Sequence, residues 1–92
     1  MSWRVTFDHA KRDATFNECG LAFEDAAIMF EGQTLDMLDD RSDYREERII
    51  TVGHLAGRMV VIVWTRRGNH RHIISMRKAN EREQNRFAQR LG

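Results

Sequence analysis

Three short apolar segments with glycines at their ends constrain the fold of this chain most strongly. They cover Ile49–Val52, Met59–Thr65 and Ile73–Met76 and are rich in β-branched residues, which favour strands. The glycines that punctuate this part of the chain are Gly53, Gly57 and Gly68. Because short connections join neighbouring strands in opposite directions, the pattern predicts three consecutive antiparallel strands.

The middle segment differs from the other two because every residue from Met59 to Trp64 is apolar. A continuous apolar run of this length predicts a central strand that is covered on both faces. The residues around the three segments are cationic: Arg48, Arg58, Arg66, Arg67, Arg71, Arg77 and Lys78. We therefore expect an apolar sheet with a positively charged rim.

The two halves of the chain carry opposite charge, although the formal net charge is only +1. Residues 1–46 contain 5 Lys/Arg and 11 Asp/Glu, a net charge of −6, and residues 47–92 contain 10 and 3, a net charge of +7. A basic half of this kind favours a polyanionic partner. The alternative is that the charges only solvate two faces of the protein.

The length of 92 residues predicts one domain that spans residues 1–92. Cys19 is the only cysteine, which is typical of a reducing compartment. No N-terminal segment resembles a signal peptide, and the apolar run Met59–Trp64 is too short to cross a bilayer. We expect a cytoplasmic protein with no membrane contact.

The N-terminal part of the sequence predicts a strand followed by two helices. Trp3–Phe7 alternates apolar and polar residues, as an edge strand does. Asp8 can cap a helix that ends at Gly20. A second helix, ending at Gly32, is indicated by apolar residues at helical spacing, namely Phe23, Ala26, Ala27 and Phe30.

The remaining elements are a strand, a loop and a last helix. Thr34–Leu38 alternates as a strand does, and Asp39–Glu46 reads as a charged connection. After the three central strands, Asn80 and Glu83 have the spacing of a capping box. The helix that follows carries Phe87 on a narrow apolar stripe.

This order predicts an α+β fold, a single antiparallel sheet with two N-terminal helices and one C-terminal helix, the helices being segregated from the sheet. The predicted core consists of Phe7, Phe23, Ala27, Phe30, Ile50, Val52, Val61, Val63, Ile74 and Phe87.

Known phosphate-loop, dinucleotide, nucleophile-elbow and zinc-finger motifs are absent from the sequence. His70 and His72 lie two residues apart on a strand and, with Cys19 or His9, have the chemistry to bind zinc. Two histidines on one face without a second spaced pair are common on basic surfaces. We therefore predict neither a metal site nor a cofactor.

The arginines of the third central segment indicate phosphate chemistry. Arg71 and Arg77 have the opposite parity to His72, so strand alternation predicts both arginines on one face and His72 on the other. Guanidinium groups bind phosphate oxygens with two parallel hydrogen bonds. With Glu47 and His70 nearby, these residues meet the needs of metal-free RNA cleavage: a base for the 2′-OH, cations for the phosphate, and an acid for the 5′ oxygen. A simple binding surface or a set of salt bridges is the alternative.

The order and spacing of several motifs resemble the BrnT toxin family over most of the chain. These motifs are Phe7-Asp8-x-x-Lys11, Gly20-Leu21-x-Phe23-Glu24-Asp25-Ala26, Asp40-Arg41-Ser42-Asp43-Tyr44-x-Glu46-x-Arg48, Val52-Gly53, Thr65-x-Arg67-Gly68, and Ile73-Ile74-Ser75-x-Arg77-Lys78-Ala79 with Glu83. The Ile-Ile-Ser-x-Arg segment is the most specific of them.

The resemblance implies a type II toxin with a RelE-like ribonuclease fold and a single toxin-like domain. Such a toxin cleaves RNA without a metal, slows translation and is neutralised by a cognate BrnA-like antitoxin. The antitoxin of such a pair supplies the DNA-binding domain, so the toxin is expected to reach operator DNA only through it.

Residue by residue, the resemblance places Lys11, Glu47, Arg48, Arg67 and Arg77 near the RNA, with Arg77 stabilising charge on the phosphate. Glu47 is the candidate base, and Glu46 is the alternative because neighbouring strand residues point to opposite faces. The full set comprises the catalytic candidates Arg77, Glu47, Arg67 and His72 and the RNA-binding candidates Lys11, Arg48, Arg71 and Lys78.

The chain departs from the family pattern at two places. It has Glu18-Cys19-Gly20 where Lys-His-Gly is common, and His72 where an arginine is frequent. Either His72 substitutes as a proton donor, or the protein is a weakened, non-catalytic member that binds an antitoxin or nucleic acid through its basic C-terminal half. A stand-alone operator-binding protein is disfavoured because the sequence shows no clear recognition-helix unit.

Overall fold

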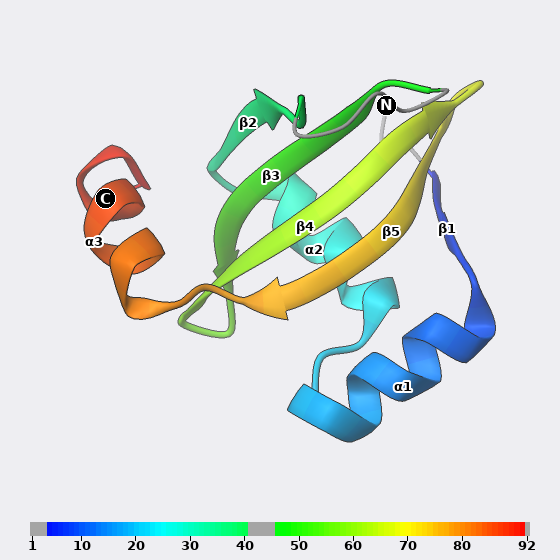
Figure 1. Ribbon diagram of the computed structural model, residues 1–92, viewed down its shortest axis with the longest axis horizontal. Helices are drawn as coiled ribbons and strands as arrows, with labels where there is room; N and C mark the ends of the chain where they lie inside the picture. Colours follow the sequence, from blue (N-terminus) through cyan, green and yellow to red (C-terminus); the bar gives the residue numbers. More distant parts are fainter. Residues whose placement is uncertain (1–3, 41–45, 92) are drawn as a thin grey trace.

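The computed structural model describes residues 4–40 and 46–91. In chain order the elements are β1 (Arg4–Phe7), α1 (His9–Cys19), the short 3₁₀ helix η1 (Phe23–Asp25), α2 (Ala26–Glu31), β2 (Thr34–Leu38), β3 (Arg48–Leu55), β4 (Arg58–Arg67), β5 (His70–Lys78) and α3 (Glu81–Leu91) (Figure 1). The predicted order of elements is confirmed. Two predicted pieces, the start of the first strand at Trp3 and residues 41–45 of the charged connection, lie outside the described residues.

The five strands form one sheet in the order β1-β5-β4-β3-β2. The pairs β2–β3, β3–β4 and β4–β5 are antiparallel, whereas β1 is parallel to β5. The prediction of a wholly antiparallel sheet is therefore wrong, and the sheet is mixed. Tight turns set the direction of the central strands, but β1 pairs with a strand far along the chain, so no hairpin constrains its direction.

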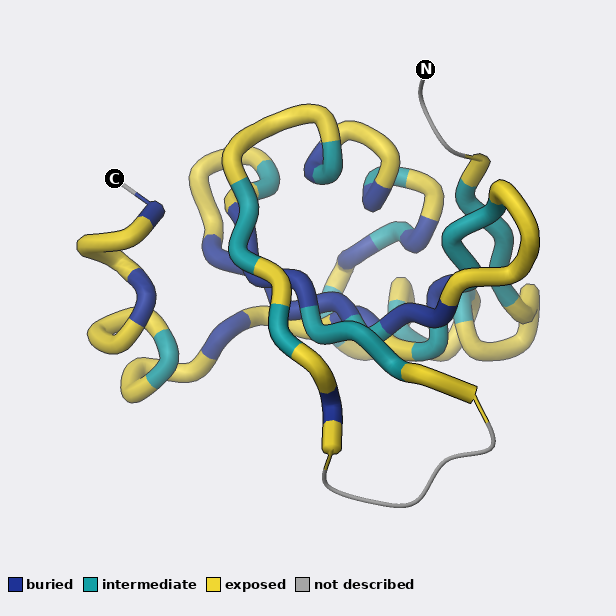
Figure 2. Tube along the Cα trace, turned by 90° about the horizontal axis from the view of Figure 1, so that it is seen from above, coloured by how far each residue is buried: buried dark blue, intermediate teal, exposed yellow. Residues whose placement is uncertain are grey.

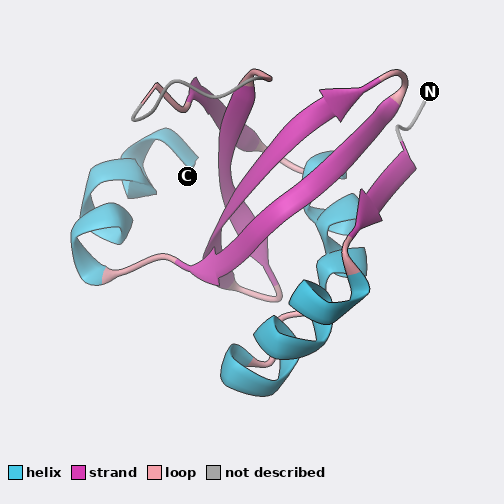
Figure 3. Ribbon diagram, turned by 45° about the vertical axis from the view of Figure 1, so that its right-hand side comes forward, coloured by secondary structure: helices cyan, strands magenta, loops and turns pink. Residues whose placement is uncertain are grey.

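Helices cover both faces of the sheet (Figure 3). On one face η1 and α2 pack on alternate residues of β4 and β5, in a cluster that includes Phe23, Met29 and Ile62. On the other face α3 packs on β3 and β4, through Phe87 and Leu91, in a cluster that includes Val52 and Val61. The predicted helices are present, but they are not segregated from the sheet as expected. Within the apolar run of β4, every residue is buried except Val63, which is half-buried. The presence of helices on both faces confirms the interpretation of β4 as a covered central strand.

Burial along the chain (Figure 2) confirms only part of the predicted core. The buried members are Phe23, Val52, Val61 and Phe87, and the half-buried members are Phe7, Phe30, Ile50, Val63 and Ile74. Ala27 is exposed, and Ala26 is buried in its place. The 3₁₀ turn η1 precedes α2, and because it has fewer residues per turn than an α-helix, it changes which alanine faces the sheet.

An irregularity between β4 and β5 changes which side chains share a face. Val63 is opposite Ser75, whereas Trp64 is opposite Ile73, so Ile74 is the extra residue. The alternation along β5 therefore shifts at this bulge. Arg71 lies on the α2 face, whereas Arg77 lies with His72 on the α3 face. The prediction that Arg71 and Arg77 share one face opposite His72 is wrong for this reason.

Side-chain caps set the ends of α1 and α3 as predicted. Asp8 accepts a hydrogen bond from the Lys11 amide at 3.1 Å, and Gly20 ends α1 in the left-handed conformation with φ 72°. Asn80 accepts from the Glu83 amide at 2.8 Å, and the Glu83 carboxylate accepts from the Asn80 amide at 2.9 Å. This reciprocal pair is a capping box. The RelE-like character of the fold stays a prediction.

Substituting Phe87 tests how α3 is held. Phe87 is one of two buried residues of α3, so Phe87→Ala should lower the free energy of unfolding by about 3 kcal/mol through lost burial and a cavity. Urea denaturation measures this. Gln89→Ala, an exposed change in the same helix, should alter it by less than about 0.5 kcal/mol. Equal effects of the two changes would contradict packing through Phe87.

Candidate functional site

A row of polar side chains crosses four strands on the α3 face, beyond the part that α3 covers. The strand register places Arg48 opposite Thr65, Thr65 opposite His72, and His72 opposite Thr6. Directly opposed residues project from the same face of a sheet, so these four side chains, here called the polar row, form one line. Thr65 is buried, and Arg48, His72 and Thr6 are half-buried.

Hydrogen bonds and one ion pair hold groups in and around the polar row. Thr6 Oγ1 lies 2.9 Å from His72 Nδ1, and Thr65 Oγ1 donates to the Glu47 carbonyl oxygen at 2.7 Å. Beside the row, Arg67 Nη2 donates to Glu46 Oε1 at 3.1 Å. The row and its two neighbours thus combine an imidazole of constrained orientation with two guanidinium groups and a carboxylate.

The surroundings set the charge states of the two titratable groups. Partial burial, and then the positive charge of Arg67, lower the pKa of His72. The hydrogen bond from Arg67 lowers the pKa of Glu46, with smaller contributions from Thr65 and Arg48. At neutral pH the site therefore presents a neutral imidazole beside a carboxylate paired with a guanidinium.

Lys11 lies in the first turn of α1, a helix that contacts β5. The positive charge of Lys11 contributes to the lowered pKa of His72, after the larger effects of burial and Arg67. The parallel pairing of β1 with β5 explains this approach, because β1 leads directly into α1 beside His72. The antiparallel sheet expected from the sequence did not include this parallel pairing.

Two predicted site residues lie on the opposite face of the sheet. The guanidinium of Arg71 stacks over Phe30, 4.0 Å from the ring centroid, and also lies 5.1 Å from the Trp64 ring centroid. Glu47 lines the same hollow as Arg71 and Trp64. The structure therefore brings Glu46, the alternative carboxylate, and not Glu47 to the polar row.

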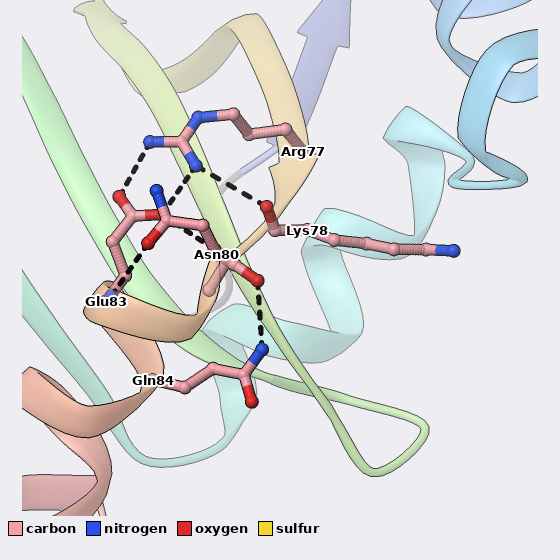
Figure 4. Close-up of polar contacts among 6 residues, drawn as sticks. Arg77, Lys78, Asn80, Glu83 and Gln84 are labelled. Carbon is pink, nitrogen blue, oxygen red and sulfur yellow. Dashed lines mark hydrogen bonds and ion pairs between the residues drawn. The ribbon is translucent and has the colours of Figure 1, made fainter.

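Arg77 lies on the same face as His72. It forms a bidentate ion pair with Glu83 of α3, in which both N–O distances are 2.7 Å (Figure 4). These hydrogen bonds lower the pKa of Glu83 to about 2. Lys78 extends away from this pair (Figure 4) and lines a separate hollow with His54 and Gly57. Of the eight predicted site residues, the structure gathers Lys11, Arg48, Arg67 and His72.

Sequence reasoning missed Thr6 and Thr65 as members of this site. Thr6 belongs to the alternating first segment and Thr65 to the apolar central one, and neither spacing suggests a pairing with His72. Among residues 4–40 and 46–91, no three His, Cys, Asp or Glu side chains are grouped to hold a metal ion. The described helices include none long and apolar enough to cross a membrane.

The sequence also identifies the family of this protein. Residues 7–83 match the family described as "Ribonuclease toxin, BrnT, of type II toxin-antitoxin system". The chain belongs to the BrnT family. The resemblance inferred from the motifs is thereby confirmed, and the matched BrnT segment contains every residue of the polar row except Thr6. A search of curated proteins finds no significant match.

Acid unfolding tests the Arg77–Glu83 pair. Because the pKa of Glu83 falls from 4.5 to about 2 on folding, its contribution is complete above pH 4.5 and is lost as the pH falls towards 2. Urea denaturation at about pH 5 and about pH 3 measures the loss of unfolding free energy. This loss should be smaller in Arg77→Met than in the wild type.

Arg82→Met is the matched control, since Arg82 is an exposed cation of α3 in the turn that holds Glu83. It should retain the acid dependence of the wild type. An identical loss in Arg77→Met and the wild type would show that the ion pair does not set the titration of Glu83.

Proposed function

We propose that this BrnT-family protein is an endoribonuclease that cleaves RNA at the polar row without a metal ion, inhibits translation, and is neutralised by a cognate antitoxin. The observation that carries the proposal is the juxtaposition of His72, whose pKa is lowered, with the cations Arg67, Arg48 and Lys11. These are the groups that transesterification of RNA requires: a proton acceptor, and fixed positive charge for the phosphate.

His72 is the proposed base. Its lowered pKa keeps the imidazole neutral at physiological pH. In the proposed tautomer Nδ1–H donates to Thr6 Oγ1, which leaves Nε2 unprotonated and able to accept the 2′-OH proton. The 2′ oxygen then attacks phosphorus. This role differs from the proton donor considered from the sequence, because a histidine with a lowered pKa is mostly unprotonated at neutral pH and has no proton to donate.

Arg67 and Arg48 are the proposed phosphate ligands. Their guanidinium groups stabilise the additional negative charge that develops on the phosphate oxygens during the attack. Glu46 holds Arg67 in place before RNA binds, and a phosphate oxygen takes over part of this pairing. We therefore propose that the Glu46 carboxylate positions Arg67 and does not act as the base.

Lys11 is the proposed proton donor to the departing 5′ oxygen, because its helix contacts β5 and its positive charge acts on His72. The bond between the 2′ oxygen and phosphorus forms while the bond between phosphorus and the 5′ oxygen breaks. The products are a 2′,3′-cyclic phosphate and a 5′-hydroxyl end. Arg77, bound by Glu83, borders this site, and no part in cleavage is proposed for Glu47, Arg71 or Lys78.

The partners follow from the family. A type II system pairs its toxin with a protein antitoxin, and we propose a BrnA-like antitoxin through which the toxin reaches operator DNA. The fold is proposed to be RelE-like and the place of action the cytoplasm, where RNA is translated. The basic character of residues 47–92 supports RNA as the substrate.

Cleavage of a defined RNA in EDTA tests the mechanism. Wild-type protein should produce 2′,3′-cyclic phosphate ends. His72→Ala should lower the rate about 100-fold or more through loss of the base, and Arg67→Ala by about 100-fold through loss of charge stabilisation. Below pH 6.5 the wild-type rate should fall as His72 becomes protonated.

Arg66→Ala is a matched control for Arg67→Ala. Arg66 is exposed, precedes Arg67 in β4, and lines the hollow on the opposite face. Its loss should leave the rate within about twofold. Equal losses at positions 66 and 67 would contradict a site confined to the face of the polar row, and a requirement for added metal would contradict the mechanism.

Expression in growing cells tests the toxin assignment separately. Wild-type protein should arrest growth when induced alone, and co-expression of its antitoxin should restore growth, because a bound antitoxin blocks RNA access. His72→Ala should grow normally without antitoxin. Unimpaired growth with high yields of intact wild-type protein would instead support a non-catalytic interaction protein.

A further inference from the structure

A groove lies beside the polar row, between α3 and the sheet, and encloses about 310 Å³. Its floor includes Met37, Ile50 and Val63, which are half-buried. The strand register aligns Met37 with Ile50, Ile50 with Val63, and Val63 with Ser75. The floor is therefore a second cross-strand line on the same face, and its residues in β3 and β4 are two positions from those of the polar row.

We infer that this groove binds the antitoxin, through an apolar side chain of the antitoxin that is flanked by carboxylates. The inference rests on the proposed function and adds to it the surface that neutralisation uses. The floor accounts for the apolar side chain, because exposed aliphatic groups in a concave surface gain stability when a partner covers them. The cationic rim of the groove accounts for the carboxylates that flank this side chain of the antitoxin.

The rim is cationic on the side of α3 and β5. Arg86 is exposed and lines the groove, with its guanidinium 5.2 Å from the Phe87 ring centroid. Arg77 lines it as well and is half exposed while paired with Glu83. A carboxylate of the partner can bind Arg86 directly and add a second acceptor to Arg77, which supplies the charge complementarity of a protein interface.

RNA fits this groove less well. Unpaired bases bind proteins by stacking on aromatic rings, but the floor is aliphatic, and Phe87, the aromatic side chain among the lining residues, is only 5% exposed. An apolar side chain of a protein segment fits this aliphatic floor better than a base does.

Occupation of the groove explains how a partner blocks cleavage. Residues two positions apart on a strand are separated by about 7 Å, so the floor at Ile50 and Val63 lies about 7 Å from Arg48 and Thr65 in the polar row. A protein segment seated on the floor therefore covers the phosphate-binding groups next to it. Neutralisation then needs no change in the fold of the toxin.

Two substitutions in the groove, each with a control residue that does not line the groove, test the inference. Met37→Asp places a charge in the floor, and Arg86→Glu reverses the rim. The control for Met37→Asp is Leu38→Asp, because Leu38 is the next residue of β2, faces the opposite side of the sheet and is 64% exposed. The control for Arg86→Glu is Arg82→Glu, because Arg82 is an exposed cation of α3 outside the groove lining. The probe is the small protein whose co-expression restores growth of cells making the wild-type toxin.

Each groove variant should still arrest growth and cleave RNA at a rate within about twofold of the wild type. Its dissociation constant for the probe should rise about tenfold or more, and more probe should be needed for growth. The controls should bind as the wild type does. Thermal unfolding of each purified variant checks that it is folded, and Arg86→Glu, a surface change, keeps the test valid if Met37→Asp is unstable.

Three outcomes overturn the inference. Unchanged binding of the probe by Arg86→Glu shows that the antitoxin binds elsewhere. Loss of RNA cleavage with unchanged probe binding assigns the groove to RNA. If wild-type protein neither arrests growth nor cleaves RNA, the proposed function itself fails, and the inference fails with it. This outcome is seen in the wild type alone, so it is distinguishable from a failure of the inference, in which the wild type is active and only the groove variants give an unexpected result.

Discussion

The register of β3, β4 and β5 is the constraint on which the rest of the structure depends. Each step of two residues along these antiparallel strands returns to the same face, so their pairing collects residues into lines across the sheet. One line is polar and contains Arg48, Thr65 and His72. The next is apolar and forms the groove floor beside α3. A slip of one residue would separate the proposed catalytic groups and bury charge.

Four arginines near these strands have four different environments, which decide what each can do. Arg48 belongs to the polar row, and Arg67 pairs with Glu46 at the edge of that row. Arg71 stacks on Phe30 on the other face, and Arg77 is bound through two nitrogens by Glu83. Equal charge in the sequence therefore does not mean equal access to a phosphate, because aromatic rings cover one guanidinium and carboxylates already accept hydrogen bonds from two others.

Local signals predicted the elements well, whereas long-range pairing limited the prediction of the site. The caps at Asp8 and Asn80 depend on residues within one helical turn, so the sequence revealed them. The extra residue at Ile74 reverses the parity of β5, and no local pattern marks it. It moved Arg77 to the face of His72, whereas a count of alternate residues had placed Arg77 with Arg71.

The sequence by itself determined the α+β order, the central apolar strand, the helix caps, the basic C-terminal half and membership of the BrnT family. These properties follow from composition, periodicity and short motifs. Only the tertiary structure decided that β1 runs parallel to β5, that Glu46 accompanies Arg67, and that Thr6 contacts His72. Each of these contacts joins residues at least 21 positions apart, and their geometry depends on strand register, direction and bulges that are set by packing of the whole chain.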